Sequence, residues 1–155
     1  MTYSRFIEEY LSKGLIKRQR VGLDQINKLI QQSRQELNDG IKILGISPKV
    51  SYTCVYNAML YAARAMMLLN GFRPIGFNQH KTVIEFAGAY IGDNYKVLFQ
   101  KFDTMRKKRN LLMYEPWKLD ISGTDTKNAI KSAEDFLSLI MRKIKEENPQ
   151  EEFKF

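Results

Sequence analysis

The stretch VSYTCVYNAMLYAARAMMLLN, residues 50–70, decides the fold of this chain. One helical face of it carries apolar and small residues at spacings of three and four: Tyr52, Val55, Tyr56, Met59, Ala62, Ala63 and Met66. Leu60 and Met67 make the opposite face apolar as well, and a helix that is apolar nearly all round is usually buried. Gly71 and Pro74 follow, as expected where a helix ends. The stretch predicts a central helix.

The rest of the chain shows the same 3.6-residue period, and no run rich in Val, Ile and Thr alternates as a strand would. Further helices are expected over residues 3–13, 26–44, 81–92 and 95–114, with a last one after the capping sequence SGTDT. The predicted class is all-α, an antiparallel up-and-down bundle of five or six helices.

The chain length of 155 residues fits a single domain that can bury a core without disulfides. No internal repeat or low-complexity linker divides it. We therefore expect one helical domain over residues 1–147. Residues 148–155 close an acidic tail that we expect to fray.

Several classes of protein are disfavoured by composition. No apolar run is long enough to cross a membrane, and the N-terminus lacks the basic and apolar regions of a signal peptide. Cys54 is the one cysteine, so no internal disulfide forms and a reducing cytoplasm fits. With His80 as the one histidine, neither a metal site nor a cofactor is expected, and a Cys–His catalytic pair has no supporting signature.

The charge of the chain points to polyanionic partners. Its formal net charge is +8 and its pI is about 9.5. Between residues 96 and 118 the basic side chains are Lys96, Lys101, Arg106, Lys107, Lys108, Arg109 and Lys118. Only Asp103 and Glu115 oppose them in that segment. A second basic segment, KGLIKRQR at residues 13–20, contains no acid.

The sequence TMRKKRNLLMYEP, residues 104–116, places an arginine on an apolar face. A helical projection puts Arg109 in the middle of an arc formed by Leu98, Phe102, Met105, Leu112 and Met113. Asn110 and Arg106 flank that arc, while Lys101, Lys107 and Lys108 point toward solvent. An unpaired guanidinium in a core costs several kcal/mol. Arg109 must therefore meet a carboxylate such as Glu85, lie at a subunit boundary, or line a polar cleft.

Four segments together resemble the HEPN domain, an all-α family with small stand-alone prokaryotic members. They are KGLIKRQ at 13–19, YNAMLYAARAMMLLNGFRP at 56–74, HKTVIEFA at 80–87 and MRKKRNLLMYEP at 105–116. The resemblance covers most of the chain. It implies a helical bundle that forms a homodimer, with the helices that carry the motif lining a cleft between the subunits.

The resemblance also implies a chemistry. HEPN members with the pattern Arg, Asn, three residues, His are similar to metal-independent endoribonuclease toxins paired with nucleotidyltransferase antitoxins, in toxin–antitoxin or phage-defence systems. By position, Arg109 and Asn110 match, and Arg109 would grip the scissile phosphate. Tyr114 stands at the histidine position and Pro116 at a position that many of these toxins fill with tyrosine. A phenol is a poor general base at neutral pH.

Three hypotheses follow. The first is a homodimer that binds RNA or a nucleotide-bearing partner at an Arg109 cleft and acts as a metal-independent endoribonuclease. Its catalytic set is Arg109, Asn110 and Tyr114, and its RNA-binding set is Arg106, Lys107, Lys108 and Lys101. The second is a non-catalytic partner subunit of a separately encoded nucleotidyltransferase. The third gives Arg109 a structural ion pair only.

The sequence leaves open the roles of two further residue types, histidine and tyrosine. His80 is expected to cap a helix or lie at the surface, and it would replace the missing base only if the fold brought it near Arg109. The tyrosines 52, 56 and 61 would either pack in the core or stack on RNA bases.

Overall fold

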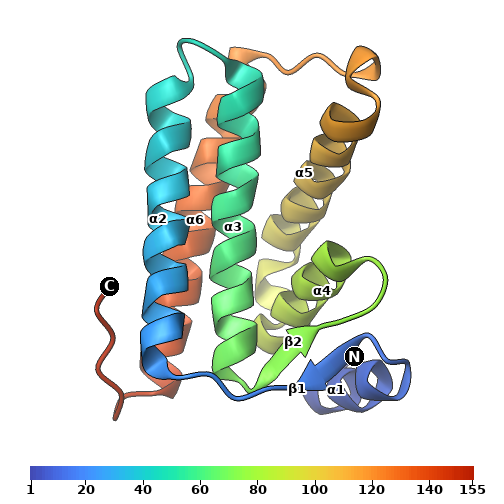
Figure 1. Cartoon of the computed structure of the whole chain (residues 1–155), viewed down its shortest axis with the longest axis vertical. Coiled ribbons are helices and arrows are strands. Elements are labelled where there is room, and N and C mark those ends of the chain that lie inside the picture. The colour runs from blue at the N-terminus through green and yellow to red at the C-terminus, as the bar shows by residue number, and fades with distance from the viewer.

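The computed structural model describes residues 1–155 and confirms an all-α helical protein (Figure 1). Its helices are α1 (Tyr3–Ser12), α2 (Leu23–Ile43), α3 (Pro48–Leu69), α4 (Gln79–Ile91), α5 (Lys96–Tyr114) and α6 (Gly123–Glu147). Two short 3₁₀ turns precede and follow α5, η1 (Asp93–Tyr95) and η2 (Pro116–Lys118). The helices predicted from the sequence agree with these bounds to within a few residues.

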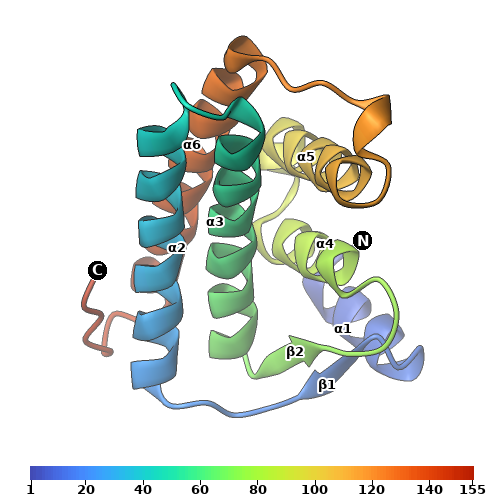
Figure 2. The same ribbon diagram turned by 45° about the horizontal axis from the view of Figure 1, so that its top comes forward.

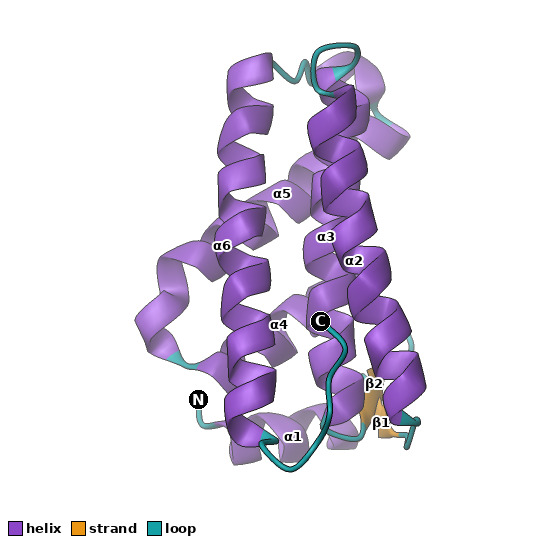
Figure 3. Cartoon of the chain, turned by 90° about the vertical axis from the view of Figure 1, so that its left-hand side faces the viewer, coloured by secondary structure: helices purple, strands orange, loops and turns teal.

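The three long helices α2, α3 and α6 lie side by side, and α3 is the central one (Figures 1 and 3). Along α3, residues from both faces are fully buried, including Tyr56, Met59 and Met67. Gly40 allows α2 to approach closely, because a Cβ atom there would lie 2.9 Å from a methyl group of Val55. The prediction of a central, all-round apolar helix is confirmed.

The helices α4 and α5 pack on the other side of α3, and α1 lies beside α4 (Figure 2). Phe102 fixes α5 in place, because its ring contacts Tyr56 of α3 and Phe136 of α6 edge-on. The ring of Phe6 on α1 packs in the same way against Phe86 on α4. These aromatic contacts join the helices into one core.

A pair of short strands was not predicted from the sequence. Strand β1 (Ile16–Arg18) pairs antiparallel with β2 (Phe72–Pro74), so that Lys17 lies opposite Arg73. Each strand has three residues, which is too short for a period of two to show in a sequence. The pair ties the basic segment after α1 to the end of α3, and the guanidinium of Arg18 stacks on the ring of Phe72.

Helix α5 departs from the prediction near its C-terminus. Met113, which was expected on the inward arc, is 53% exposed. Leu112, by contrast, is buried as expected. The helix leans away from α3 toward this end (Figure 1), so the side of its last turn that carries Met113 and Tyr114 is left uncovered. Since α5 is exposed where it carries Met113 and Tyr114, its last turn belongs to the surface.

The C-terminal tail runs back beside the lower end of α2 (Figure 3). The backbone N–H of Lys154 donates to the buried side-chain oxygen of Asn27, and Phe153 and Phe155 pack against the core. Fraying of this tail, which stays a prediction, would have to break these contacts. No helix of the chain combines the length and the hydropathy that a membrane span requires.

Candidate anion-binding site

Arg109 is half-buried on α5, and no carboxylate forms an ion pair with it. Its Nε atom is buried and has no hydrogen-bond partner. Glu85, the acid considered as its partner, instead accepts a hydrogen bond from the hydroxyl of Tyr10 and lies 3.7 Å from Lys81 Nζ. The structural ion pair between Arg109 and Glu85 is therefore not formed.

Arg106, one turn earlier on α5, is paired. Its side chain is 13% exposed, and its Nε donates to Asp103 Oδ1 at 2.8 Å. Lys107 Nζ lies 3.3 Å from the other oxygen of the same carboxylate. Partial burial would raise the pKa of Asp103, but the hydrogen bonds and charges of Arg106 and Lys107 hold it below its ordinary value. Asp103 is thus shared by two cations, so positive charge is in excess here.

Tyr56 and His80 bring α3 and α4 into the same cluster. The hydroxyl of the fully buried Tyr56 lies 3.0 Å from His80 Nδ1, in the first turn of α4. Burial and the charges of Arg109, Arg64 and Arg106 lower the pKa of His80. The fold therefore does bring His80 within electrostatic reach of Arg109. His80 is half-buried and bonded to a core tyrosine, so the expectation of a surface or capping histidine was wrong.

The hydrogen bond also fixes the proton on His80. Burial raises the pKa of Tyr56 further than Arg109 and Arg106 lower it, so this phenol keeps its proton. The contact with His80 is its one hydrogen bond, and a buried O–H group left without an acceptor is costly. Tyr56 therefore donates to Nδ1, and the hydrogen of the neutral imidazole stands on Nε2. His80 consequently presents an N–H donor to its surroundings.

The start of α4 supplies further donors. Asn78 precedes the helix in a left-handed conformation, with φ of 54°, and its side chain makes no capping hydrogen bond. The first backbone bond of the helix runs from Thr82 to Asn78, so the N–H groups of residues 79–81 have no acceptor within the protein. Such free N–H groups at the positive end of a helix dipole favour an anion.

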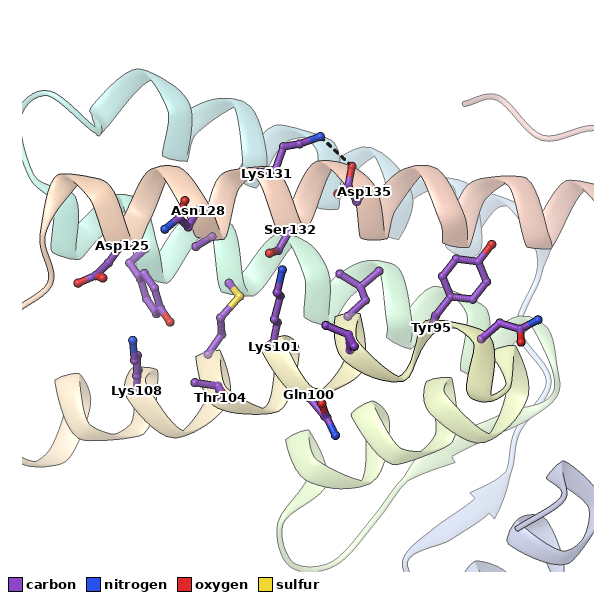
Figure 4. A pocket seen from close by; sticks show the side chains of 16 residues that line it. Tyr95, Gln100, Lys101, Thr104, Lys108, Asp125, Asn128, Lys131, Ser132 and Asp135 are labelled. Carbon is purple, nitrogen blue, oxygen red and sulfur yellow. Dashed lines mark hydrogen bonds and ion pairs between the residues drawn. The ribbon is translucent and has the colours of Figure 1, made fainter.

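The residues predicted from the motif separate onto different surfaces. Asn110 is half-buried beside Arg109 and makes no side-chain hydrogen bond, whereas Tyr114 is 72% exposed at the end of α5. Lys107 points outward to Asp103. Lys101 and Lys108 line a groove of about 970 Å³ between α5 and α6 (Figure 4). The structure thus brings Arg106 and Arg109 together and places these two lysines elsewhere.

A second, smaller cavity of about 410 Å³ lies between α4 and α5. Lys81 and Glu85 line it from α4, and Asp103 and Lys107 line it from α5. Arg109 lines neither this cavity nor the larger groove. It lies on α5 nearly two turns beyond Asp103, and its charge acts on His80 in the first turn of α4.

Sequence reasoning missed Tyr56 and Arg64 as members of this cluster. Both lie within the central helix, where a tyrosine indicates core packing and an arginine indicates a solvent contact. Only the crossing of α3, α4 and α5 brings them to Arg109. The structure gathers no set of three His, Cys, Asp or Glu side chains that could hold a metal ion.

Comparisons with known proteins assign no family. No protein-family model matches the chain, and neither a curated protein nor a solved structure matches it. The function must therefore be argued from the geometry of the site.

Proposed function

We propose that this chain is a cytoplasmic, HEPN-like homodimer that binds RNA, and that Arg109 holds a backbone phosphate. The observation that carries the proposal is the half-buried guanidinium of Arg109, whose Nε has no acceptor and whose charge has no acid beside it. Leaving such a group unpaired is costly. A ligand oxygen that reaches it supplies the missing acceptor.

The other donors of the cluster suit the same ligand. A phosphate oxygen can accept from the guanidinium of Arg109, from the free N–H groups of α4 and from Nε2–H of His80. Arg106 and Arg64 add positive potential to the cluster, and Asp103 is the acid that partly offsets it. Hydrogen bonds between charged partners are about twice as strong as neutral ones, and arginine suits phosphate because its planar fork binds two oxygens.

The geometry favours binding over cleavage. Attack by a ribose 2′-hydroxyl needs a general base. His80 presents a donor rather than a base, because its Nδ1 is engaged by Tyr56. Tyr114, at the position of the catalytic histidine in the toxins that the motif resembles, makes no contact with Arg109 and is exposed.

Binding is tested by fluorescence anisotropy with a short, labelled, single-stranded RNA. We expect Arg109→Ala to weaken binding about tenfold or more, since a hydrogen bond to a charged group contributes about 1.5–3 kcal/mol. Lys107→Ala is the matched control, because it removes one positive charge from the same helix at an exposed position. Equal losses in the two variants would reduce the site to non-specific attraction and contradict the proposal.

Cleavage is tested separately with unlabelled RNA in EDTA. We expect no strand scission above that of Arg109→Ala protein. Scission by the wild type that disappears in both Arg109→Ala and His80→Gln would show that His80 acts as a base. The protein would then be an endoribonuclease and not only an RNA-binding protein.

A second candidate function is favoured by an exposed apolar surface at the end of α5. Met113, Tyr114 and Trp117 are each more than half exposed there. In this alternative the chain is a non-catalytic subunit that docks a nucleotidyltransferase antitoxin. A nucleotidyltransferase reading frame beside the gene, and co-purification that Trp117→Glu abolishes and Arg109→Ala does not, would support this role.

The same surface is the boundary that we propose for the homodimer. Sedimentation velocity on the wild type and on Trp117→Glu separates the two roles. A wild-type dimer that becomes a monomer in Trp117→Glu supports dimerisation through this end of α5. A dimer that persists in the variant contradicts it.

A further inference from the structure

The groove between α5 and α6 has a volume of about 970 Å³. Figure 4 shows the side chains that line it, and neither Arg106 nor Arg109 is among them. From α5 it is lined by Lys101, Thr104 and Lys108, which recur at spacings of three and four. Asp125, Asn128 and Ser132 line it from α6 with the same spacing. Two helical stripes therefore face one another across it.

These facing stripes are polar, although helices that pack together normally meet through apolar residues. The floor of the groove is apolar, with Tyr52 and Met105 buried and Ala129 leaving room, and the exposed Tyr95 and Val97 line one end of it. Lys101, Thr104 and Asn128 make no hydrogen bond to another residue across the gap. The groove is thus an apolar floor between two rows of side chains that are free to bind.

Ser132 is the most informative of these residues. Only 8% of it is exposed, and its hydroxyl makes no hydrogen bond. The four other buried serine and threonine side chains, of Ser33, Ser51, Thr82 and Thr126, all donate to backbone carbonyls. Figure 4 shows Ser132 directed across the groove toward the ammonium group of Lys101. The Lys101 ammonium and the Ser132 hydroxyl thus lie on facing sides of the groove, and no hydrogen bond engages either of them within the protein.

We propose that this groove binds one nucleotide, with its phosphate between Lys101 and Ser132. The base lies on the floor formed by Tyr52 and Met105. The two facing donors suit an anion, and the apolar floor suits the flat face of a base. The volume lies within the range of about 300–1,000 Å³ that small-molecule sites occupy. The site is distinct from Arg109 and does not depend on the function proposed there.

The far end of the groove contacts the polar groups of the base and the ribose. Asp125 and Asn128 lie there, and Asp125 is seven residues from Ser132, about 10 Å along α6. Asp125 and Ser122 form the capping box of α6. Those hydrogen bonds, together with the charge of Lys108, lower the pKa of Asp125. Asp125 is therefore a carboxylate, which can accept hydrogen bonds from amino groups of the base or from ribose hydroxyl groups. The one other acid of the groove, Asp135, is paired with Lys131 at 3.3 Å. No carboxylate therefore opposes a phosphate at Lys101.

The nucleotide can be free or can be one unit of an RNA strand. Isothermal titration calorimetry with the common ribonucleoside monophosphates, with a short RNA and with inorganic phosphate separates these sources. We expect saturable binding of at least one monophosphate that Lys101→Gln and Ser132→Ala each weaken about fivefold to tenfold. Lys107→Gln, one residue from Lys108 but on another face, leaves it unchanged.

If the monophosphates fail to bind but Lys101→Gln and Ser132→Ala weaken RNA binding, the nucleotide is one of a strand, and the proposal holds. Inorganic phosphate that binds as tightly as the nucleotides would reduce the groove to an anion site and overturn it. Wild-type affinity in both variants, or no binding of any probe, would also overturn it. A loss of monophosphate binding in Arg109→Ala, with wild-type affinity in Lys101→Gln and Ser132→Ala, would assign the nucleotide to the Arg109 cluster and overturn the proposal.

Discussion

The two faces of α5 use positive charge differently. Toward α3 and α4 the helix presents Arg106 and Arg109, whose head groups are largely withdrawn from solvent beside Tyr56 and His80. Toward α6 it presents Lys101 and Lys108 across an open groove. Arginine is weakly hydrated and keeps its charge when buried, whereas lysine keeps a strongly hydrated ammonium group at the surface. The basic residues of α5 thus belong to two separate sites, because the helical period places them on different faces.

The largest effect is expected from a substitution that removes the packing contact on which both faces of α5 depend. Phe102 is fully buried and holds α5 against Tyr56 and Phe136. Phe102→Ala should lower the free energy of unfolding by about 3–5 kcal/mol, as is usual for a buried phenylalanine. Urea denaturation followed by circular dichroism measures this loss. A loss below about 1 kcal/mol would mean that α5 is not anchored to the core, and that neither face has a fixed geometry.

The next prediction compares the two arginines of one face. Arg106→Met should lower the free energy of unfolding by about 1 kcal/mol, because it removes the close partner of Asp103. Arg109→Met should leave it unchanged or raise it, since methionine replaces a buried group that has no partner. Denaturation of both variants tests the pair. A larger loss for Arg109→Met than for Arg106→Met would show that Arg109 is held by contacts within the protein.

Salt dependence sharpens the comparison between phosphate contacts and general attraction. Each phosphate contact adds about 0.7–0.9 to the slope of log affinity against log salt. Arg109→Ala should therefore reduce the slope for RNA by about one contact, and Lys107→Ala should reduce it less because that ammonium is already paired with Asp103. Anisotropy titrations over a range of salt concentrations give both slopes. Identical slopes in wild type and Arg109→Ala would show that Arg109 contacts no phosphate.

The smallest effect concerns His80. Its pKa in the folded protein is below the ordinary value of 6.5, so the unfolded chain binds the proton more tightly. Stability should therefore fall as the pH drops through about 6.5, and His80→Gln should flatten that part of the profile. Thermal unfolding between neutral and mildly acidic pH measures it. A profile that rises toward acid would mean that His80 is stabilised as a cation.

The fold could be predicted because its signals are long and periodic. The all-round apolar pattern of α3 predicts that helix, and the capping sequence that begins at Ser122 predicts the start of α6. The strand pair at Ile16 and Pro74 could not be predicted, because three residues carry no period. Met113 was misplaced because a helical projection assumes neighbours along the whole apolar face, and at the end of α5 they cover Leu112 but not Met113.

The candidate site was predictable in part. The position of Arg109 on an apolar arc showed that its charge needs an explanation, and this could be read from the spacing alone. Tyr56 and His80 could not be assigned to it, because they are 24 residues apart in the chain and meet only where α3 and α4 cross. The groove of Lys101 and Ser132 was also hidden, since it depends on how far α5 stands from α6.

The central claim is that the guanidinium of Arg109 stands unpaired and receives a phosphate. The Nε–H resonance of Arg109, assigned by its loss in Arg109→Lys, reports on this most directly in a titration with single-stranded RNA followed by ¹⁵N NMR. We predict that this signal shifts and saturates with the same affinity as the anisotropy titration, while the amide signal of Lys107 moves little. An Nε–H signal that stays in place while RNA binds would contradict the account.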